Sequence, residues 1–224
     1  METIIYLIRH SLKFSNSRIK EFKSSQSNII KSEKIVLSVD GEKRALKLSE
    51  LEELNNLDIV YTSNCVRTLD TAKYIIEKQN LDVVIDENFD EKKVGKSNED
   101  EYPDWFRLQY LDENFKTIGG ESRKEVTQRF SKSFDEVLNN NIGKRIAIFS
   151  HGYALTFFLM KYASLDEITN DRYYKFSYKD KVFFEGKLDA PEIFKLTFKN
   201  KNLIKIENIK IDYEEVKNGW YIYN

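Results

Sequence analysis

Short apolar runs alternate with amphipathic stretches along most of this chain. Four runs rich in apolar and β-branched residues predict buried strands at residues 3–8, 58–62, 81–85 and 145–149. Stretches with helical spacing lie between or after them at residues 46–54, 65–78, 121–139 and 153–162. Strands and helices that take turns predict an α/β fold with three α/β/α layers, in which a mostly parallel central sheet carries helices on both faces. Two further apolar runs, at 193–198 and 203–209, flank a polar tetrapeptide and predict a C-terminal β-hairpin.

Two segments lack a clear period. Residues 11–40 are polar and rich in Ser, Lys and Asn, which predicts a long variable loop with a short helix inside it. Residues 96–118 lie in a charged and aromatic region that we interpret as a cap segment. The helix that follows begins with Ser122 and Glu125, which fit a capping box. Because no repeat, low-complexity tract or linker divides the chain, we expect a single domain over residues 1–224.

Composition narrows the class of protein. The 224 residues include 36 Lys and Arg against 37 Asp and Glu, a formal net charge of -1. Proteins that bind nucleic acids or membrane surfaces usually carry a basic excess, so we expect neither partner. The single cysteine rules out an internal disulfide and fits a reducing compartment. With no signal peptide pattern and no apolar stretch long enough to span a bilayer, we expect a cytoplasmic protein.

Only two histidines occur in the chain, and each follows a predicted strand. Arg9 and His10 come directly after the first strand, and His151 comes directly after the fourth. Imidazole can change its charge near neutral pH and can act as a nucleophile. Either histidine alone is more simply explained as a hydrogen-bonded structural residue. Together they indicate a site, because ligands of open α/β sheets bind at the carboxyl ends of the strands.

Several other chemistries lack their residues. A cysteine phosphatase needs an arginine six residues after the nucleophile, but Thr71 holds that position relative to Cys65. No two aspartates are two residues apart, which excludes the acidic pair of aspartyl phosphatases. A phosphate-binding P-loop ending at Ser97 would need glycine where Asp90 stands. Two histidines and one cysteine, with no close spacing of the histidines, argue against a zinc site, and no Gly-x-Ser-x-Gly motif supports a serine hydrolase.

The candidate site that remains is a cluster of cationic side chains at the ends of the predicted strands. The second strand leads into a helix whose first turn carries Arg67, and a helix also follows His151. Together with Arg9, these cations and the N–H groups at the helix ends predict a strong anion site. Phosphoryl transfer needs positioning and charge neutralisation of this kind, and so many fixed cations leave no requirement for a metal.

Three motifs follow one another along the chain: Leu7-Ile8-Arg9-His10, then Ser63-Asn64-Cys65-Val66-Arg67-Thr68 with Thr71-Ala72, and finally Ser150-His151-Gly152. In this order they resemble the motifs of the histidine phosphatase superfamily, which includes the cofactor-dependent phosphoglycerate mutases. Supporting matches are Asn16, Glu91 four residues before Gly95, and Gly119-Gly120-Glu121-Ser122 at the start of the long helix. The resemblance extends over most of the chain, from the first strand to the terminal hairpin.

This resemblance implies a role for each matched residue. His10 would be the nucleophile that carries a covalent phosphate, neutral and held in the right tautomer by a backbone carbonyl. Arg9, Arg67 and a cationic His151 would bind the phosphoryl oxygens. Glu91 would donate a proton to the leaving oxygen and later activate water, with its neighbour Asp90 as a competitor for that role.

Hydrogen bonds to the phosphate would come from Asn16 and Ser63, although Ser63 could instead be a helix N-cap. Glu121 and Ser122 would help to hold the site, and Cys65 is interpreted as a small buried residue. The resemblance implies no cofactor.

The chain departs from the family pattern after His10. The family commonly has Gly-Glu-Thr there, whereas this chain has Ser11-Leu12-Lys13. The loss of glycine adds a side chain near the phosphate, and we expect Ser11 to be small enough for activity, with a hydroxyl that can donate a hydrogen bond. The leucine argues against close kinship with the phosphoglycerate mutases.

We therefore favour a metal-independent phosphomonoester hydrolase that acts on a small phosphorylated metabolite. A phosphoglycerate mutase-type phosphotransferase and a non-catalytic phospholigand-binding protein are the alternatives. The aromatic segment 102–110 would wall the pocket or pack as a helical cap, and Arg107 would read a second anionic group. The sequence leaves the substrate and the oligomeric state open.

Overall fold

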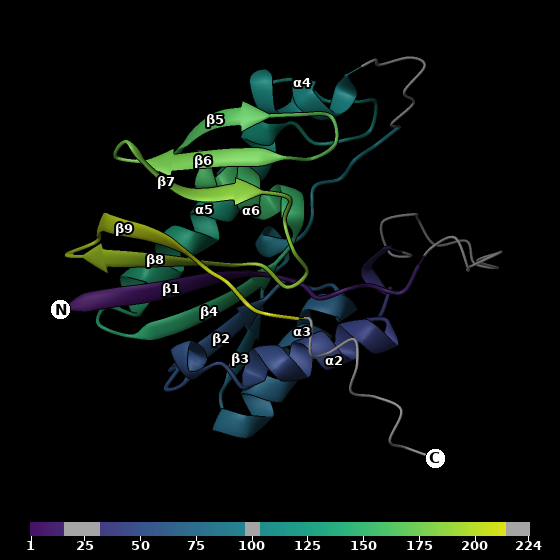
Figure 1. The fold of residues 1–224 in the computed structure, drawn as a ribbon. Coiled ribbons are helices and arrows are strands. Elements are labelled where there is room, and N and C mark those ends of the chain that lie inside the picture. The colour runs from purple at the N-terminus through teal and green to yellow at the C-terminus, as the bar shows by residue number, and fades with distance from the viewer. Residues whose placement is uncertain (16–31, 97–103, 214–224) are drawn as a thin grey trace.

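A six-stranded sheet lies at the centre of the computed structural model, which describes residues 1–15, 32–96 and 104–213 (Figure 1). Its strands, in spatial order, are β3 (Val83–Ile85), β2 (Ile59–Thr62), β4 (Arg145–Ser150), β1 (Glu2–Arg9), β8 (Ile193–Lys199) and β9 (Asn202–Ile209). β1, β4, β2 and β3 pair in parallel, whereas β8 runs antiparallel to β1 and forms a hairpin with β9. The predicted mostly parallel sheet and C-terminal hairpin are therefore confirmed.

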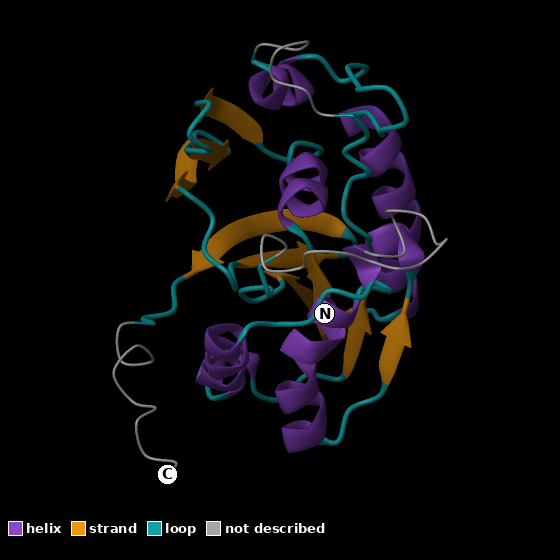
Figure 2. Cartoon of the chain, turned by 90° about the vertical axis from the view of Figure 1, so that its right-hand side faces the viewer, coloured by secondary structure: helices purple, strands orange, loops and turns teal. Residues whose placement is uncertain are grey.

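Helices cover both faces of this sheet, as the second view shows (Figure 2). α2 (Val39–Ser49) and α3 (Val66–Gln79) pack on one face, and α5 (Arg123–Asn140) and α6 (Gly152–Leu159) on the other. Alternate residues of β1 serve the two cores: Tyr6 faces the α2–α3 side, and Leu7 faces the α5–α6 side. Because both faces are buried, the strands read as continuous apolar runs, and the predicted three-layer arrangement is confirmed.

One predicted helix has the wrong bounds. The expected helix at 46–54 is α2, which begins at Val39 and is followed by a short 3-10 helix, η2 (Glu52–Leu54). The start is set by Ser38, whose Oγ accepts a hydrogen bond from the backbone N–H of Gly41 at 3.0 Å. The cap lies inside the stretch predicted as the variable loop, and the apolar spacing alone did not reveal it.

One sheet was not predicted, and it lies next to a helix inside the segment that we expected to form a cap. β5 (Ser164–Ile168), β6 (Tyr174–Tyr178) and β7 (Lys181–Gly186) form an antiparallel three-stranded sheet. α4 (Trp105–Leu111) lies near this sheet, on the side of the central sheet that carries α5 and α6 (Figure 1). The Tyr110 hydroxyl of α4 lies 2.9 Å from Thr156 Oγ1 in α6 and 3.0 Å from the Tyr174 hydroxyl in β6. These contacts join α4 and the second sheet into one cap. None of the described helices is both long and apolar enough to cross a membrane.

The loop after β1 is held against the start of α2. Ser11 is fully buried, and its hydroxyl donates a hydrogen bond to the carbonyl of Gly41 at 2.7 Å. The Ser11 side chain therefore points to α2, and its hydroxyl hydrogen is used in the bond to Gly41 and is not free to donate to a phosphate in the cleft. A Cβ atom on Gly41 would lie 2.0 Å from the carbonyl oxygen of Leu12, so this position requires glycine.

We expect Gly41→Ala to destabilise the protein by about 1–3 kcal/mol, because the added methyl group must displace the backbone next to His10. In an ordinary helix interior the same change stabilises by up to about 1 kcal/mol, so the sign of the effect is diagnostic. Urea unfolding of the variant measures it, with Leu46→Ala, at an exposed position of the same helix, as the control. A Gly41→Ala protein more stable than wild type would contradict the close approach.

Candidate active site

The carboxyl ends of β1, β2 and β4 open into a cleft of about 1250 Å³. Arg9 and His10 line it from β1, Arg67 from α3, and Glu91 from the segment after η3 (Glu87–Phe89). His151 is fully buried beside them, with its ring centroid 5.1 Å from that of His10. The structure thus gathers these five candidate residues around one space. Asn16, a further candidate, lies outside the described residues, and Ser63 contacts His151 directly.

His10 is held in one tautomer by the backbone. Its Nδ1 lies 2.7 Å from the carbonyl oxygen of Ser11, so Nδ1 carries the proton and donates it. Nε2 is then left with its lone pair. Burial lowers the pKa of His10 well below its ordinary value, and the charges of Arg67 and Arg9 lower it further. The ring is therefore neutral at pH 7 and has the protonation state of a nucleophile.

His151 is fixed by two side chains. Arg67 Nη2 lies 3.0 Å from its Nδ1, and Ser63 Oγ lies 2.8 Å from its Nε2. Because a guanidinium can only donate, Nδ1 must accept, and the ring proton belongs on Nε2. Burial lowers the pKa of His151 well below its ordinary value, and Arg67 and His10 lower it further. His151 is therefore neutral in the free site, because a buried imidazole next to a guanidinium loses its proton, and a cationic His151 stays an expectation for the site with phosphate bound.

The hydrogen-bond partners of Ser63 include His151. Its hydroxyl contacts His151 Nε2, lies 3.0 Å from Thr68 Oγ1, and accepts a hydrogen bond from the backbone N–H of Cys65 at 3.2 Å. The N-cap position of α3 belongs to Cys65, so the alternative of Ser63 as an N-cap is wrong. The geometry makes Ser63 a positioning residue for His151.

The two guanidiniums keep donors for a ligand. Arg9 Nη1 donates to the backbone carbonyls of residues 188 and 189, both at 2.9 Å, and Arg67 Nη1 donates to the carbonyl of Ser32 at 2.8 Å. The Nε atom of each arginine is buried and has no hydrogen-bond partner in the described part of the chain. Neither arginine forms an ion pair with a described carboxylate. Two guanidiniums at one edge of the sheet, neither paired with a described carboxylate, favour the binding of an anion.

Two adjacent carboxylates reach this cleft. Glu91 Oε1 accepts hydrogen bonds from the backbone N–H of Ala154, at 3.1 Å, and of Lys92, at 3.0 Å. Asp90 Oδ1 accepts one from the backbone N–H of Asn64 at 2.9 Å. Burial raises the pKa of Asp90 to about 6. Both carboxylates line the cleft, so the choice of acid between Glu91 and Asp90 stays open on geometry.

The segment that carries these carboxylates is clamped by Arg129, which the sequence did not reveal. Its guanidinium donates to the backbone carbonyls of Asn88 at 2.8 Å, Asp90 at 2.9 Å and Glu91 at 3.2 Å. The same group pairs with Glu121, with Nε 2.9 Å from Oε1. Glu121 therefore holds the site through Arg129. The signal in the sequence was weak, because the contacts reach backbone atoms about forty positions away.

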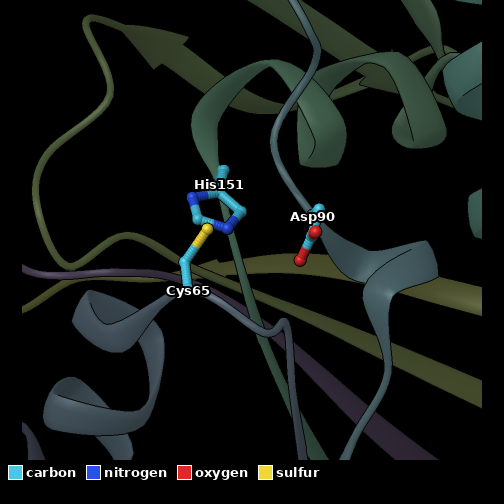
Figure 3. Close-up of side chains that lie close together, drawn as sticks. All are labelled: Cys65, Asp90 and His151. Carbon is cyan, nitrogen blue, oxygen red and sulfur yellow. The ribbon is translucent and has the colours of Figure 1, made fainter. Parts of the chain in front are cut away.

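Cys65, Asp90 and His151 lie together at the back of the cleft, with ligand atoms within 4.8 Å of one another (Figure 3). They are the one group of this kind among the residues that the structure describes. The donor set suits a metal ion poorly. Both nitrogens of His151 already contact Arg67 and Ser63, and burial raises the pKa of the Cys65 thiol to about 11. A cation would also lie next to the Arg67 guanidinium, so we interpret Cys65 as a packing residue.

Comparison with known proteins gives a family and a fold. The model of the histidine phosphatase superfamily (branch 1) matches residues 5–179. Phosphoserine phosphatase 1 of Hydrogenobacter thermophilus is 30% identical over 124 residues, which cover 51% of this chain and 58% of that protein. The match therefore spans a little over half the length of this curated relative.

Two solved structures share the fold over nearly the whole length. A mycobacterial glucosyl-3-phosphoglycerate phosphatase superposes with a TM-score of 0.66 at 15% identity, covering 93% of this chain and 97% of that chain. The alpha-ribazole phosphatase from Shigella flexneri gives a TM-score of 0.62 at 16% identity, with coverage of 93% and 99%. At such low identity, these likenesses establish the architecture.

The lowered pKa of His151 predicts a pH-dependent stability. The unfolded chain titrates this ring near pH 6.5, whereas the folded protein takes up the proton only at lower pH. Below about pH 6.5 the proton therefore stabilises the unfolded state, and the free energy of unfolding falls by up to about 1.4 kcal/mol per pH unit. We expect His151→Gln to flatten this decline in urea unfolding between pH 7.5 and 5.5.

Asp90 supplies the control with the opposite sign. Its pKa is raised in the folded protein, so protonation below about pH 6 stabilises the folded state. Asp90→Asn should therefore make the decline steeper. Parallel stability curves for wild type and His151→Gln would show that the ring is not held neutral.

Proposed function

The chain belongs to the histidine phosphatase superfamily, and we propose that it is a metal-independent phosphomonoester hydrolase that acts on a small phosphorylated metabolite through a phosphohistidine intermediate. The observation that carries this proposal is a neutral His10 with an unprotonated Nε2, at the edge of a cleft that is lined by two guanidiniums without an ion pair to a described carboxylate. The names of the relatives, which are phosphatases of phosphoserine, glucosyl-3-phosphoglycerate and alpha-ribazole, support hydrolysis.

In the first step, the N–H groups of Arg9 and Arg67 that lack a hydrogen-bond partner among the described residues bind the phosphoryl oxygens. His10 Nε2 attacks phosphorus, the N–P bond forms, and the bond from phosphorus to the ester oxygen breaks. The electron pair goes to the leaving oxygen, which takes a proton from Glu91 or Asp90. Guanidiniums placed where negative charge develops stabilise this transition state without reorganisation.

Binding of the substrate changes the state of His151. A phosphate dianion in the cleft stabilises the imidazolium and raises the pKa of His151 again. The added proton must sit on Nδ1, because Nε2 already carries one. Protonation at Nδ1 ends its contact with Arg67 Nη2. One event thus gives His151 a new donor and frees a guanidinium N–H, and both can turn to the phosphoryl group.

In the second step, the carboxylate that lost its proton becomes the base. It takes a proton from water, the oxygen attacks phosphorus, and the N–P bond breaks. Inorganic phosphate leaves and His10 returns to its neutral form. A mutase would use the same phosphohistidine with a hydroxyl acceptor, so the two activities differ only in what the intermediate meets.

We expect His10→Ala to abolish phosphate release from an activated aryl phosphate, while the folded protein persists. The assay contains EDTA and compares variant with wild type, and circular dichroism checks the fold. Acid-labile labelling of wild type, absent from the variant, would identify the phosphohistidine. Turnover that survives in His10→Ala, or that EDTA removes from wild type, would contradict the proposal. Labelling by a phosphorylated primer without phosphate release would favour the mutase.

The acid is identified by its dependence on the leaving group. Removal of the acid should slow esters of poorly acidic alcohols on the order of a hundredfold or more, and aryl phosphates much less, because only the alcohol needs the proton. We expect Glu91→Gln to show this difference, measured as kcat on alkyl and aryl phosphates. Asp90→Asn is the matched control at the neighbouring carboxylate. The reverse result would assign the proton to Asp90, and equal losses on both esters would exclude Glu91 as the acid.

A further inference from the structure

The cleft is much larger than a phosphoryl group. Its volume of about 1250 Å³ exceeds the usual range for small-molecule pockets, and its far side is built by the cap. Trp105 and Phe106 of α4 line it there, as do Arg172 and Tyr174 of the second sheet. With the phosphoryl group at His10, the alcohol part of the substrate faces the cap. The cap side chains that line the cleft therefore indicate which chemical groups this alcohol carries.

Seven further cations line the cleft beyond the pair of arginines at the strand ends: Lys13, Lys92, Lys93, Lys96, Arg129, Arg172 and Lys187. Arg129 and Lys187 form ion pairs with Glu121 and Asp171, and the three lysines at 92, 93 and 96 belong to the segment that carries Glu91. Lys13 comes from the loop after β1, and Arg172 comes from the turn between β5 and β6. Lys13 is exposed, yet desolvation lowers the pKa of its ammonium, and the charges of Arg67, Arg9 and Arg172 lower it further while Glu91 raises it. Lys13 therefore lies close enough to these three arginines to be repelled by them.

Neither Lys13 nor Arg172 forms an ion pair with a carboxylate of the described residues. Two lysines near Arg172 are paired: Lys187 lies 2.8 Å from Asp171, and Lys175 lies 3.6 Å from Glu185. Asp171, the chain neighbour of Arg172, therefore neutralises Lys187, and Arg172 lines the cleft without an ion pair to a described carboxylate.

Arg172 is also placed by its surroundings. Its backbone N–H donates to the carbonyl of Thr169 at 3.1 Å, and the N–H of Thr169 donates to the carbonyl of Tyr173 at 3.1 Å, which closes the turn. The guanidinium carbon lies 5.5 Å from the centroid of the Phe106 ring. A guanidinium held over an aromatic face keeps its N–H edge available for a carboxylate or phosphate.

We propose that Lys13 and Arg172 form a second anion subsite, so that the alcohol part of the substrate carries a carboxylate or a further phosphate. This inference rests on the proposed function, because it assigns the remainder of a substrate whose phosphoryl group lies at His10. A phosphomonoester dianion meets the charge of Arg9 and Arg67, and a second anionic group meets the charge of Lys13 and Arg172. The sequence suggested this role for Arg107, which is not among the residues that line the cleft.

Matched substrates test the subsite. 3-Phosphoglycerate and glycerol 3-phosphate differ by a carboxylate in place of a hydroxymethyl group, and fructose 1,6-bisphosphate and fructose 6-phosphate differ by one phosphate. We expect wild type to favour the more anionic member of at least one pair on the order of tenfold or more in kcat/KM. The pair that shows the preference tells whether the group is a carboxylate or a phosphate.

Variants of the cap assign the preference to Arg172. Arg172→Gln should reduce the ratio of kcat/KM values within the favoured pair on the order of tenfold, and Arg172→Lys should reduce it less because the charge remains. The control is Lys181→Gln, at an exposed cation of β7 that does not line the cleft, and it should leave the ratio unchanged. An Arg172→Gln ratio equal to that of wild type would overturn the role of Arg172.

Binding to His10→Ala separates this inference from the proposed function. Calorimetry gives the affinity of each probe for a protein that cannot turn it over. Tighter binding of the more anionic member, lost in His10→Ala/Arg172→Gln, supports the subsite even if wild type hydrolyses none of the probes. Equal affinities within both pairs would overturn the subsite even if wild type hydrolyses all of them.

Discussion

The parallel pairing of β1 with β4 is the constraint on which the site depends. In this register Arg9 lies opposite Ser150, so the next residue of each strand is a histidine, and the two rings come within 5.1 Å. The backbone N–H of His10 donates to the carbonyl of Ser150 at 2.9 Å and extends the ladder to the first ring. A shift of the register by one residue would turn a histidine to the opposite face of the sheet. The apolar side chains on both faces of β1 exclude such a shift and thereby set the distance between the rings.

Positive charge next to these rings sets their chemistry. Desolvation makes an isolated buried imidazolium unfavourable, and the neighbouring guanidiniums add to the effect, so the same arginines that attract a phosphate keep His10 neutral until it arrives. Because Arg67 contacts His151, the arginine and the second ring respond to an anion together. Arg129 has a separate task. It fixes the carboxylate segment through three carbonyls, and it keeps its own charge balanced by Glu121. Arg129 also lines the cleft, but it differs from Arg9 and Arg67 in that a carboxylate neutralises its charge.

The sequence predicted those parts of the molecule that depend on local pattern. Buried parallel strands are continuous apolar runs, and the residues that follow them must reach the same edge of the sheet, so the amino-acid pattern alone was enough to group His10, His151 and Arg67. The second sheet was not predicted because β5 and β7 are largely exposed, and their mixture of charged and aromatic residues shows no hydrophobic periodicity. The hydrogen-bond partners of Ser63 and Arg129 could not be predicted for another reason. Their contacts lie 88 and about 40 positions away and involve a ring nitrogen and backbone carbonyls, which leave no pattern in the residues between.

Reaction and selectivity arise in different parts of this fold. The strand ends are fixed by a core that surrounds them, so a substitution there disturbs both packing and chemistry. The cap meets the cleft through one turn and one short helix, and the aromatic cluster around Tyr110 secures it to α6. A change in the β5–β6 turn can therefore exchange the group that faces the alcohol without moving a ring at the strand ends. Ser11 shows the complementary constraint at the edge of the sheet. Its side chain replaces the glycine of the family pattern, yet the hydroxyl bonds to Gly41 and α2 comes close enough to require a glycine of its own. The side chain added at Ser11 is thus accommodated because position 41 has no side chain, and α2 can approach the loop that follows His10.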